Sequence, residues 1–377
     1  MKSFFAAIGK YIRQTDLILL FLCLSASTIG FIMIGGIVTI EMTDTRDLIM
    51  QIAATVIGLG AAIVVSLFDY RFLAKMWKLH VPIAILLVFA TLLFGQQRGE
   101  ADDMAWLVFK ITSSFSISFQ PSELLKISYI LSFALHLETV RENLNKWKTL
   151  IPVLIHGLYP AVLIHIQGDD GTMLVFLCVF VCMIFTAGLS WKYIGLAAGC
   201  VVAAVPVAWN FIMTADQKNR ILAVLNPDFD QRNIGWQQYQ GRISIGSGQL
   251  WGIGVFSPDH RTSVPEIQND FIFAFIGESL GFIGAFGVIL LLMSVAFKIL
   301  LNASVAQDYL GKYICVGMFA VITFQTLINI GMCLSILPVI GITLPFLSCG
   351  GTSVATLYLG IGLALSVFMH NRRTLFS

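Results

Sequence analysis

The segment LILLFLCLSASTIGFIMIGGIVTI, residues 17–40, decides the fold class of this chain because it contains no charged side chain. A helix needs about 20 apolar residues to cross roughly 30 Å of hydrocarbon. Further apolar runs follow at about residues 48–67, 81–95, 121–138, 151–166, 171–188, 193–214, 271–297, 313–335 and 343–369. The pattern predicts an all-α polytopic integral membrane protein with about ten transmembrane helices.

The composition agrees with this class. The 377 residues are 57% hydrophobic and 12% charged, with a mean hydropathy of +0.86, whereas an average soluble domain has about 25% charged residues. The runs are too long for the alternating strands of an outer-membrane barrel. The formal charge of +2 gives no reason to propose a nucleic acid partner. The seven cysteines show neither a disulfide framework nor zinc-ligand spacing.

Positive charge predicts the orientation of the helices. With the N-terminus in the cytoplasm, the inner segments contain fourteen lysines and arginines and the short outer loops contain three. Since cytoplasmic loops are enriched in these residues, both termini are expected to be cytoplasmic. The long loop at about residues 215–270, between helices 7 and 8, is then extracytoplasmic. Its length suggests a function, and we expect residues 1–377 to form a single membrane domain around it.

A charged pair opens the fourth predicted span, in the segment FQPSELLK at residues 119–126. Pro121 suits a first helical turn, and Glu123 is favoured there by the helix dipole. Glu123 and Lys126 are three residues apart, so they share one face of the helix and can pair. The pair is either an ordinary ion pair at a helix start or the lining of an outward-facing cavity. We favour the cavity, because ionisable residues within a span usually serve function.

Two adjacent carboxylates lie between spans five and six, in the segment GDDGT at residues 168–172. This composition is typical of a tight turn, followed by Thr172 as a cap of the next helix. Asp169 and Asp170 could also hold a divalent cation at the outer face. The spacing alone does not distinguish the turn from the cation site.

The long loop contains a glycine-rich segment, IGSGQLWGIG, at residues 245–254. A glycine-rich backbone can cradle phosphate through its N–H groups. The segment is neither a Walker nor a dinucleotide-binding signature. A flexible loop is therefore the favoured interpretation of these residues alone.

Three carboxylates gather where the long loop returns to the membrane, in and after the segment PEIQNDFIF at residues 265–273. Asn269 or Asp270 could simply cap the eighth span. A carboxylate at the edge of hydrocarbon is also expected to have a raised pKa through desolvation, as a general base near neutral pH requires. Glu266 precedes Asp270, and Glu278 lies two helical turns beyond it.

Several motifs, in a fixed order, give the chain a close resemblance to the SEDS family of bacterial membrane glycosyltransferases, the RodA, FtsW and SpoVE group. They are DYR (69–71), FQPSELLK (119–126), DDGT (169–172), IGSG (245–248), PEIQNDFIF (265–273) and LPVIGITLPFLSCGGTS (337–353). The short N-terminus and the DYR motif make the chain most like RodA. The chain departs from the family pattern at Gly168, at Cys349, and at Gln268-Asn269, where His-Thr is frequent.

The resemblance implies polymerisation of lipid II into glycan strands at the outer face of the bacterial cytoplasmic membrane, with release of undecaprenyl pyrophosphate. Asp270 is the expected general base. A pyrophosphate leaving group needs positive charge, for which Lys126, Arg242 and Arg261 are the candidates. The remaining expected cavity residues are Glu123, which would orient Lys126, together with Glu266, Glu278 and Ser348.

The resemblance also bears on cofactors and partners. A divalent cation, Mg²⁺ or Mn²⁺, is expected near Asp169 if one takes part, and the expected partner is a class B penicillin-binding protein, a transpeptidase. Two alternatives stay open at this stage: a lipid II flippase, and a scaffold that recruits an enzyme. Carboxylates gathered on the outer side near the long loop favour the enzyme, because a flippase only releases its cargo there.

Overall fold

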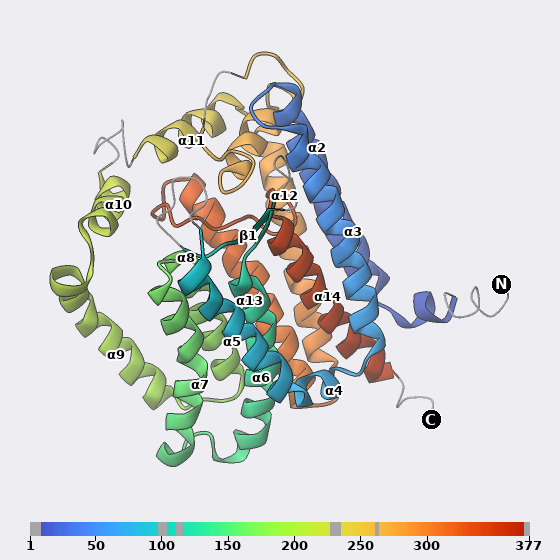
Figure 1. Ribbon diagram of the computed structural model, residues 1–377, viewed down its shortest axis with the longest axis vertical. Helices are drawn as coiled ribbons and strands as arrows, with labels where there is room; N and C mark the ends of the chain where they lie inside the picture. Colours follow the sequence, from blue (N-terminus) through green and yellow to red (C-terminus); the bar gives the residue numbers. More distant parts are fainter. Residues whose placement is uncertain (1–8, 97–103, 111–115, 227–234, 261–263, 373–377) are drawn as a thin grey trace.

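The computed structural model describes residues 9–96, 104–110, 116–226, 235–260 and 264–372 (Figure 1). Within these residues, ten helices correspond to the predicted spans. They are α2 (Leu17–Thr39), α3 (Thr45–Leu67), α5 (Trp77–Phe94), α6 (Pro121–Val140), α7 (Trp147–Ile166), α8 (Asp170–Thr186), α9 (Trp191–Val207), α12 (Ile272–Ser304), α13 (Tyr309–Cys333) and α14 (Gly351–Arg372).

The prediction of a polytopic helical membrane protein is confirmed. Eight helices in the described part of the chain are long and apolar enough to cross a membrane. α8 is apolar but shorter, with 17 residues. The remaining helix, α6, contains the charged residues Glu123, Lys126 and Glu138. Its charges are tolerated because most of the helix is buried among its neighbours.

Aspartate side chains cap several of these helices at their N-termini. Asp16 accepts from the backbone N–H of Leu19 in α2, and Asp308 accepts from that of Gly311 in α13. A carboxylate at this position satisfies an N–H that has no partner within the helix, and it interacts favourably with the helix dipole. These local signals set where the helices begin.

The helices form one bundle with α13 in its interior. α13 packs against α6, α8, α12 and α14, while α14 packs along α3. Figure 1 shows α9 at the edge of the bundle, and none of its residues is buried. Large side chains fill the interior, among them Tyr129, Tyr313 and Tyr358. All seven cysteines are free, as the sequence predicts.

The two ends of the bundle differ in structure. The N- and C-terminal parts of the chain lie toward one end, and α10 and α11 lie at the other (Figure 1). The two terminal parts share one end because an even number of described helices, ten, runs between the two ends of the bundle. The first end also includes α4 (Tyr70–Lys75) and a 3₁₀ turn (Arg141–Asn143). There Arg71 Nε lies 2.5 Å from Asp308 Oδ2, which ties α4 to the start of α13.

The second end contains secondary structure that the sequence analysis did not predict. A hairpin of β1 (Leu107–Lys110) and β2 (Ser116–Phe119) leads directly into α6, with Leu107 opposite Phe119. A π-helical turn (Ala208–Ile212) follows α9. The long loop then forms α10 (Ala215–Leu225) and α11 (Trp236–Ser247), and α11 packs on α12 and α13.

Two of the predicted boundaries are wrong. The run at 343–369 is not helical throughout, because α14 begins only at Gly351 and residues 343–350 form irregular backbone. Pro345 disfavours a helix there, and the segment packs into the bundle instead. α12 extends to Ser304 and contains a break at Gly281, whose φ of +65° favours glycine. The backbone of residues 249–254 bonds to α12 on both sides of that break.

Candidate active site

Asp270 is the last polar residue before α12, and its carboxylate faces the connection between α13 and α14. The N-cap position of α12 belongs to Phe271, which makes no side-chain cap. A Cβ placed on Gly341 would lie 3.5 Å from Asp270 Oδ2, so the carboxylate packs against the backbone of that connection. The Asp270 residue is half-buried. Asp270 therefore lies at the loop-rich end of the bundle, beside the α13–α14 connection, and Phe271 rather than Asp270 has the N-cap position of α12.

Residues 334–350, here called the α13–α14 connection, lie against Asp270 on one side of this site. They join several elements: Gln51 Nε2 of α3 donates to Phe346 O at 3.3 Å, and Thr343 Oγ1 lies 3.2 Å from Ser353 Oγ of α14. Gly171 of α8 lies so close that a Cβ there would be 2.2 Å from Ile340 O. The connection thus lies against Asp270 on one side and α8 on another.

Glu123 and Lys126 form the ion pair that their spacing predicts. Lys126 Nζ lies 2.8 Å from Glu123 Oε1, and the two side chains are 3% and 8% exposed, respectively. The hydroxyl of Thr356 in α14 lies 3.4 Å from Glu123 Oε2. Both charges are therefore inside the bundle, next to the helix that follows the α13–α14 connection. In this conformation the ammonium group is not open to solvent.

Asp169 serves as the N-cap of α8. Its Oδ1 accepts from the backbone N–H of Thr172 at 2.8 Å, and its Oδ2 accepts from Gln120 Nε2 at 3.1 Å. The turn-and-cap alternative thus describes its geometry. Among the described residues, no three His, Cys, Asp or Glu side chains gather as a metal site would require. The divalent cation near Asp169 therefore stays a prediction from the sequence.

The other two carboxylates of the predicted cluster have separate surroundings. Glu266 accepts from the side-chain amide of Asn269, within the turn that leads to Asp270. Glu278 is buried: its Oε2 accepts from Ser244 Oγ of α11 at 2.9 Å and lies 3.4 Å from His260 Nδ1. Glu278 therefore joins α11 and residue 260 to α12.

Of the two arginines that the sequence analysis predicted in the long loop, the structure describes only one. Arg242 is half-buried on α11, whereas Arg261 lies outside the described residues. A further cation, Arg220 on α10, was missed by the sequence analysis: its Nη1 donates to Val339 O at 3.3 Å. Val339 is two residues from Gly341, which contacts Asp270. Helix α10 has a capping box between Thr214 and Gln217, and this signal could have located the helix and drawn attention to Arg220.

Ser348 does not face a substrate-accessible space. It is 1% exposed, and its hydroxyl accepts from the backbone N–H of Leu344 at 2.7 Å and donates to Asn269 O at 2.5 Å. The side chain therefore bonds the α13–α14 connection to the residue before Asp270.

The glycine-rich segment is only partly a loop, and the backbone of residues 249–254 bonds to α12. Residues up to Ser247 belong to helix α11. Gly248 lies against α12, where a Cβ would be 2.0 Å from Gly277 O. The small residue permits a close approach of the two backbones, which is a packing role.

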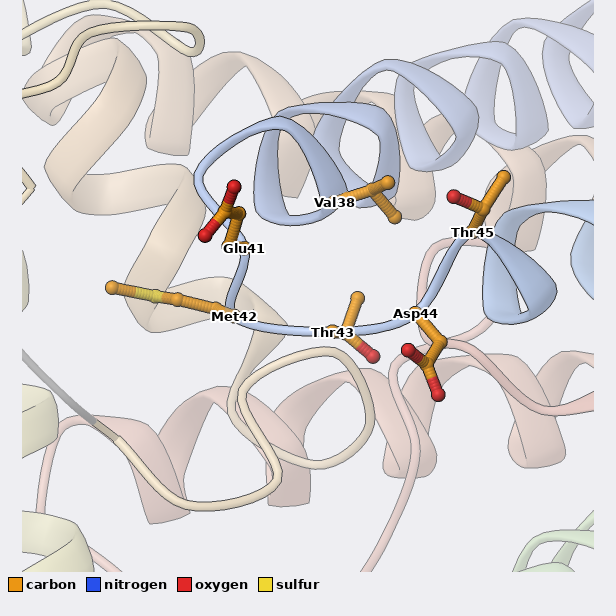
Figure 2. Close-up of a pocket in the computed structure, with 6 residues that line it drawn as sticks. All are labelled: Val38, Glu41, Met42, Thr43, Asp44 and Thr45. Atoms are coloured by element: carbon orange, nitrogen blue, oxygen red, sulfur yellow. The ribbon is translucent and has the colours of Figure 1, made fainter.

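A pocket of about 510 Å³ lies at the turn between α2 and α3 (Figure 2). It is lined by Val38, Glu41, Met42, Thr43, Asp44 and Thr45. Two of these six residues are acidic, which does not suit an anionic pyrophosphate. The sequence analysis placed no functional residue here.

The fold and the site together define a multi-pass membrane protein with a carboxylate-containing site at the loop-rich end of its bundle. The chain belongs to the FtsW/RodA/SpoVE family, whose model, described as "Cell cycle protein", matches residues 16–373.

Several relatives have been identified by sequence. The peptidoglycan glycosyltransferase MrdB of Escherichia coli is 31% identical over 294 residues, which is 77% of each chain. The stage V sporulation protein E of Bacillus subtilis is 30% identical and covers 95% of this chain and 98% of its own length.

Solved structures share the fold. One comes from work on the structural coordination of polymerization and crosslinking by a peptidoglycan synthase complex; it matches with a TM-score of 0.78 and 26% identity, over 95% of this chain and 98% of that chain. A mutant of the rod shape determining protein RodA of Thermus thermophilus matches with a TM-score of 0.69 and 26% identity, over 96% and 99% of the two chains.

Proposed function

We propose that this protein is a peptidoglycan glycosyltransferase that polymerises lipid II into glycan strands and releases undecaprenyl pyrophosphate. The proposal is supported by the family and by relatives named peptidoglycan glycosyltransferase. The structural observation that carries it is the Asp270 carboxylate, which immediately precedes Phe271, the N-cap residue of α12, and packs against the α13–α14 connection at Gly341.

The chemistry needs a base and a source of positive charge. A sugar 4-hydroxyl of one lipid-linked molecule attacks the anomeric carbon of another, and Asp270 takes the hydroxyl proton. The bond between the anomeric carbon and the pyrophosphate oxygen breaks as the new glycosidic bond forms, so the anomeric centre inverts. Arg220 donates to Val339 O of the α13–α14 connection, and Arg242 lies on α11, which packs on α12 and α13. The two arginines would stabilise the charge that develops on the leaving group.

In this proposal the buried pair of Glu123 and Lys126 lies in the interior of the site and acts on the leaving group. Lys126 would reach a pyrophosphate only after an opening between α6 and α14, where Thr356 now contacts Glu123. Glu123 would then orient Lys126 toward the leaving group. No step of the proposed reaction depends on a metal ion.

The proposed location is the bacterial cytoplasmic membrane, with both termini inside and with α10, α11 and Asp270 on the outer side. The charge distribution supports this orientation. The proposed partner is a class B penicillin-binding protein. The match to a peptidoglycan synthase complex that coordinates polymerization and crosslinking supports this pairing, because crosslinking requires a transpeptidase beside the polymerase.

The experiment that tests the function is lipid II polymerisation by the purified protein, with and without its penicillin-binding partner. Asp270→Asn keeps the size of the side chain and removes the base, so we expect glycan strands from the wild type and none from the variant. Asp259→Asn is the matched control, since it neutralises an exposed carboxylate of the same loop. Its product should equal that of the wild type.

Other outcomes contradict parts of the proposal. Equal product from Asp270→Asn and the wild type would refute Asp270 as the base, and Glu266 would be tested next. No product from the wild type, in an assay where a known polymerase works, would refute the enzyme. A lipid II flipping assay would then test the transporter alternative.

A further inference from the structure

Three consecutive backbone carbonyls leading to the proposed base are held by donors from another part of the chain. Gln268 O accepts from the backbone N–H of Cys349 at 2.8 Å. Asn269 O accepts from Ser348 Oγ at 2.5 Å, and Asp270 O accepts from Asn329 Nδ2 at 2.7 Å. Two of the donors belong to the α13–α14 connection and the third to α13.

Asn329 has the most constrained position of the three donors. It is 0% exposed, and its Nδ2 donates both to Asp270 O and to Ile342 O, the latter at 2.6 Å. Since both partners are carbonyl oxygens, the group facing them must be the amide nitrogen, whose two hydrogens are then both used. One side chain thus connects the backbone of Asp270 to that of the α13–α14 connection.

The bonds from Asn329 matter for the position of Asp270 because residues 264–271, which precede α12, have no helical or sheet ladder of their own. A backbone without such a ladder is held only by its turns and by donors from outside. The α13–α14 connection also contacts the carboxylate itself through Gly341. The carbonyl of Asp270 is therefore held by Asn329, which also bonds this connection at Ile342, and its side chain lies against the same connection at Gly341.

We propose that Asn329 and Ser348 are positioning residues that hold the Asp270 carboxylate in its reactive place by bonding the backbone at residues 269 and 270. The inference rests on the proposed function, in which Asp270 is the base. Neither residue touches the substrate. Their effect reaches the reaction through the placement of Asp270, and a shift of about 1 Å in a reacting group can cost about 100-fold in rate.

The test compares Asn329→Leu and Ser348→Ala with a matched control, Thr326→Val. Leu is close to Asn in size but lacks the amide, and Ser348→Ala is the milder change if Asn329→Leu fails to fold. Thr326 is a neighbour of Asn329 on α13, is also 0% exposed, and donates only within its own helix, to Ile322 O at 2.7 Å. Its replacement removes a buried hydroxyl without touching Asp270.

Three quantities are measured for each purified variant: kcat and KM for lipid II polymerisation, binding of fluorescent lipid II, and hydrogen–deuterium exchange of residues 264–271. We expect kcat to fall by about 10- to 100-fold in Asn329→Leu and by less in Ser348→Ala. Lipid II binding and KM should stay close to the wild-type values, and residues 264–271 should exchange faster. Thr326→Val should match the wild type in all three.

Wild-type kcat in both variants would overturn the inference. So would a parallel loss of kcat and lipid II binding that Thr326→Val shares, since this would indicate a general packing defect. If the wild type makes no product, the proposed function fails, and the exchange measurement alone decides the positioning role. Unchanged exchange at residues 264–271 in both variants would then overturn it.

Discussion

The buried ion pair of Glu123 and Lys126 allows stability and function to be separated. In Lys126→Met the ammonium group is lost and the unbranched chain up to the ε carbon is kept. Glu123 then stays as a carboxylate that is 8% exposed, with the Thr356 hydroxyl 3.4 Å away from its Oε2. In the double variant Glu123→Gln, Lys126→Met no charge is left, and the amide can still bond Thr356.

The magnitude follows from the geometry of the pair. The two charges are 2.8 Å apart and are 3% and 8% exposed, so solvent screens them little. Removing one partner of such a pair leaves an uncompensated buried charge, which costs about 3–5 kcal/mol, whereas replacing both is often close to neutral. Since about 1.4 kcal/mol corresponds to a factor of ten, the single variant should shift the folding equilibrium by about two to three and a half orders of magnitude.

The assay is reversible unfolding in mixed micelles by titration with SDS, followed by tryptophan fluorescence, with polymerisation measured on the same samples. We expect Lys126→Met to unfold at a clearly lower SDS fraction, and the double variant to recover most of the loss. If the pair also serves the reaction, the double variant should be stable and inactive. Full activity in the stable double variant would leave the pair a purely structural role.

Two results would refute the reasoning on stability. Lys126→Met with the stability of the wild type would show that Glu123 is hydrated or protonated without cost. A double variant as unstable as the single variant would show that the loss comes from packing around the Lys126 side chain, because charge compensation would then have no effect.

Two further predictions concern the packing around the site. His260→Leu should lower the free energy of unfolding by about 1–3 kcal/mol in the same SDS titration, because it removes the imidazole 3.4 Å from the buried Glu278 carboxylate. His260→Gln keeps a donor and should lower it by less. Equal losses in the two variants would contradict this explanation. Gly171→Val should reduce polymerisation by about tenfold or more, because its Cβ would lie 2.2 Å from Ile340 O. The control Gly246→Ala, with nothing within 4 Å of its Cβ, should keep wild-type activity. Normal activity in Gly171→Val would show that the α13–α14 connection can move without affecting the site.

The sequence predicted the elements whose signals are local. Most of the ten spans are apolar runs without a charged residue, and burial of such a run in hydrocarbon requires a helix whatever its neighbours are. The pairing of Glu123 with Lys126 was also predictable, because residues three apart on a helix are neighbours. The cap at Asp169 was one of two predicted alternatives, and it is the one whose bonds are found.

Shorter elements were missed because their stability depends on what they pack against. Helices α10 and α11 have 11 and 12 residues, which is marginal for an isolated helix in water. α11 forms where it can pack on α12 and α13. Likewise, the run at 343–369 contains no charged residue, so its hydropathy alone did not reveal that α14 begins at Gly351 and that the residues before it follow an irregular path.

The sequence by itself determined that this chain is a membrane-spanning helical bundle, which of its polar residues lie near the ends of spans, and that Asp270 is a candidate base. Only the tertiary structure decided which residues meet Asp270. Asn329 is one of two side-chain amides in the apolar run at 313–335, and Ser348 is a small hydroxyl in the run at 343–369. Their importance comes from contacts between residues 59 and 79 positions apart, and such contacts depend on how the helices pack together, which no local pattern in the sequence specifies.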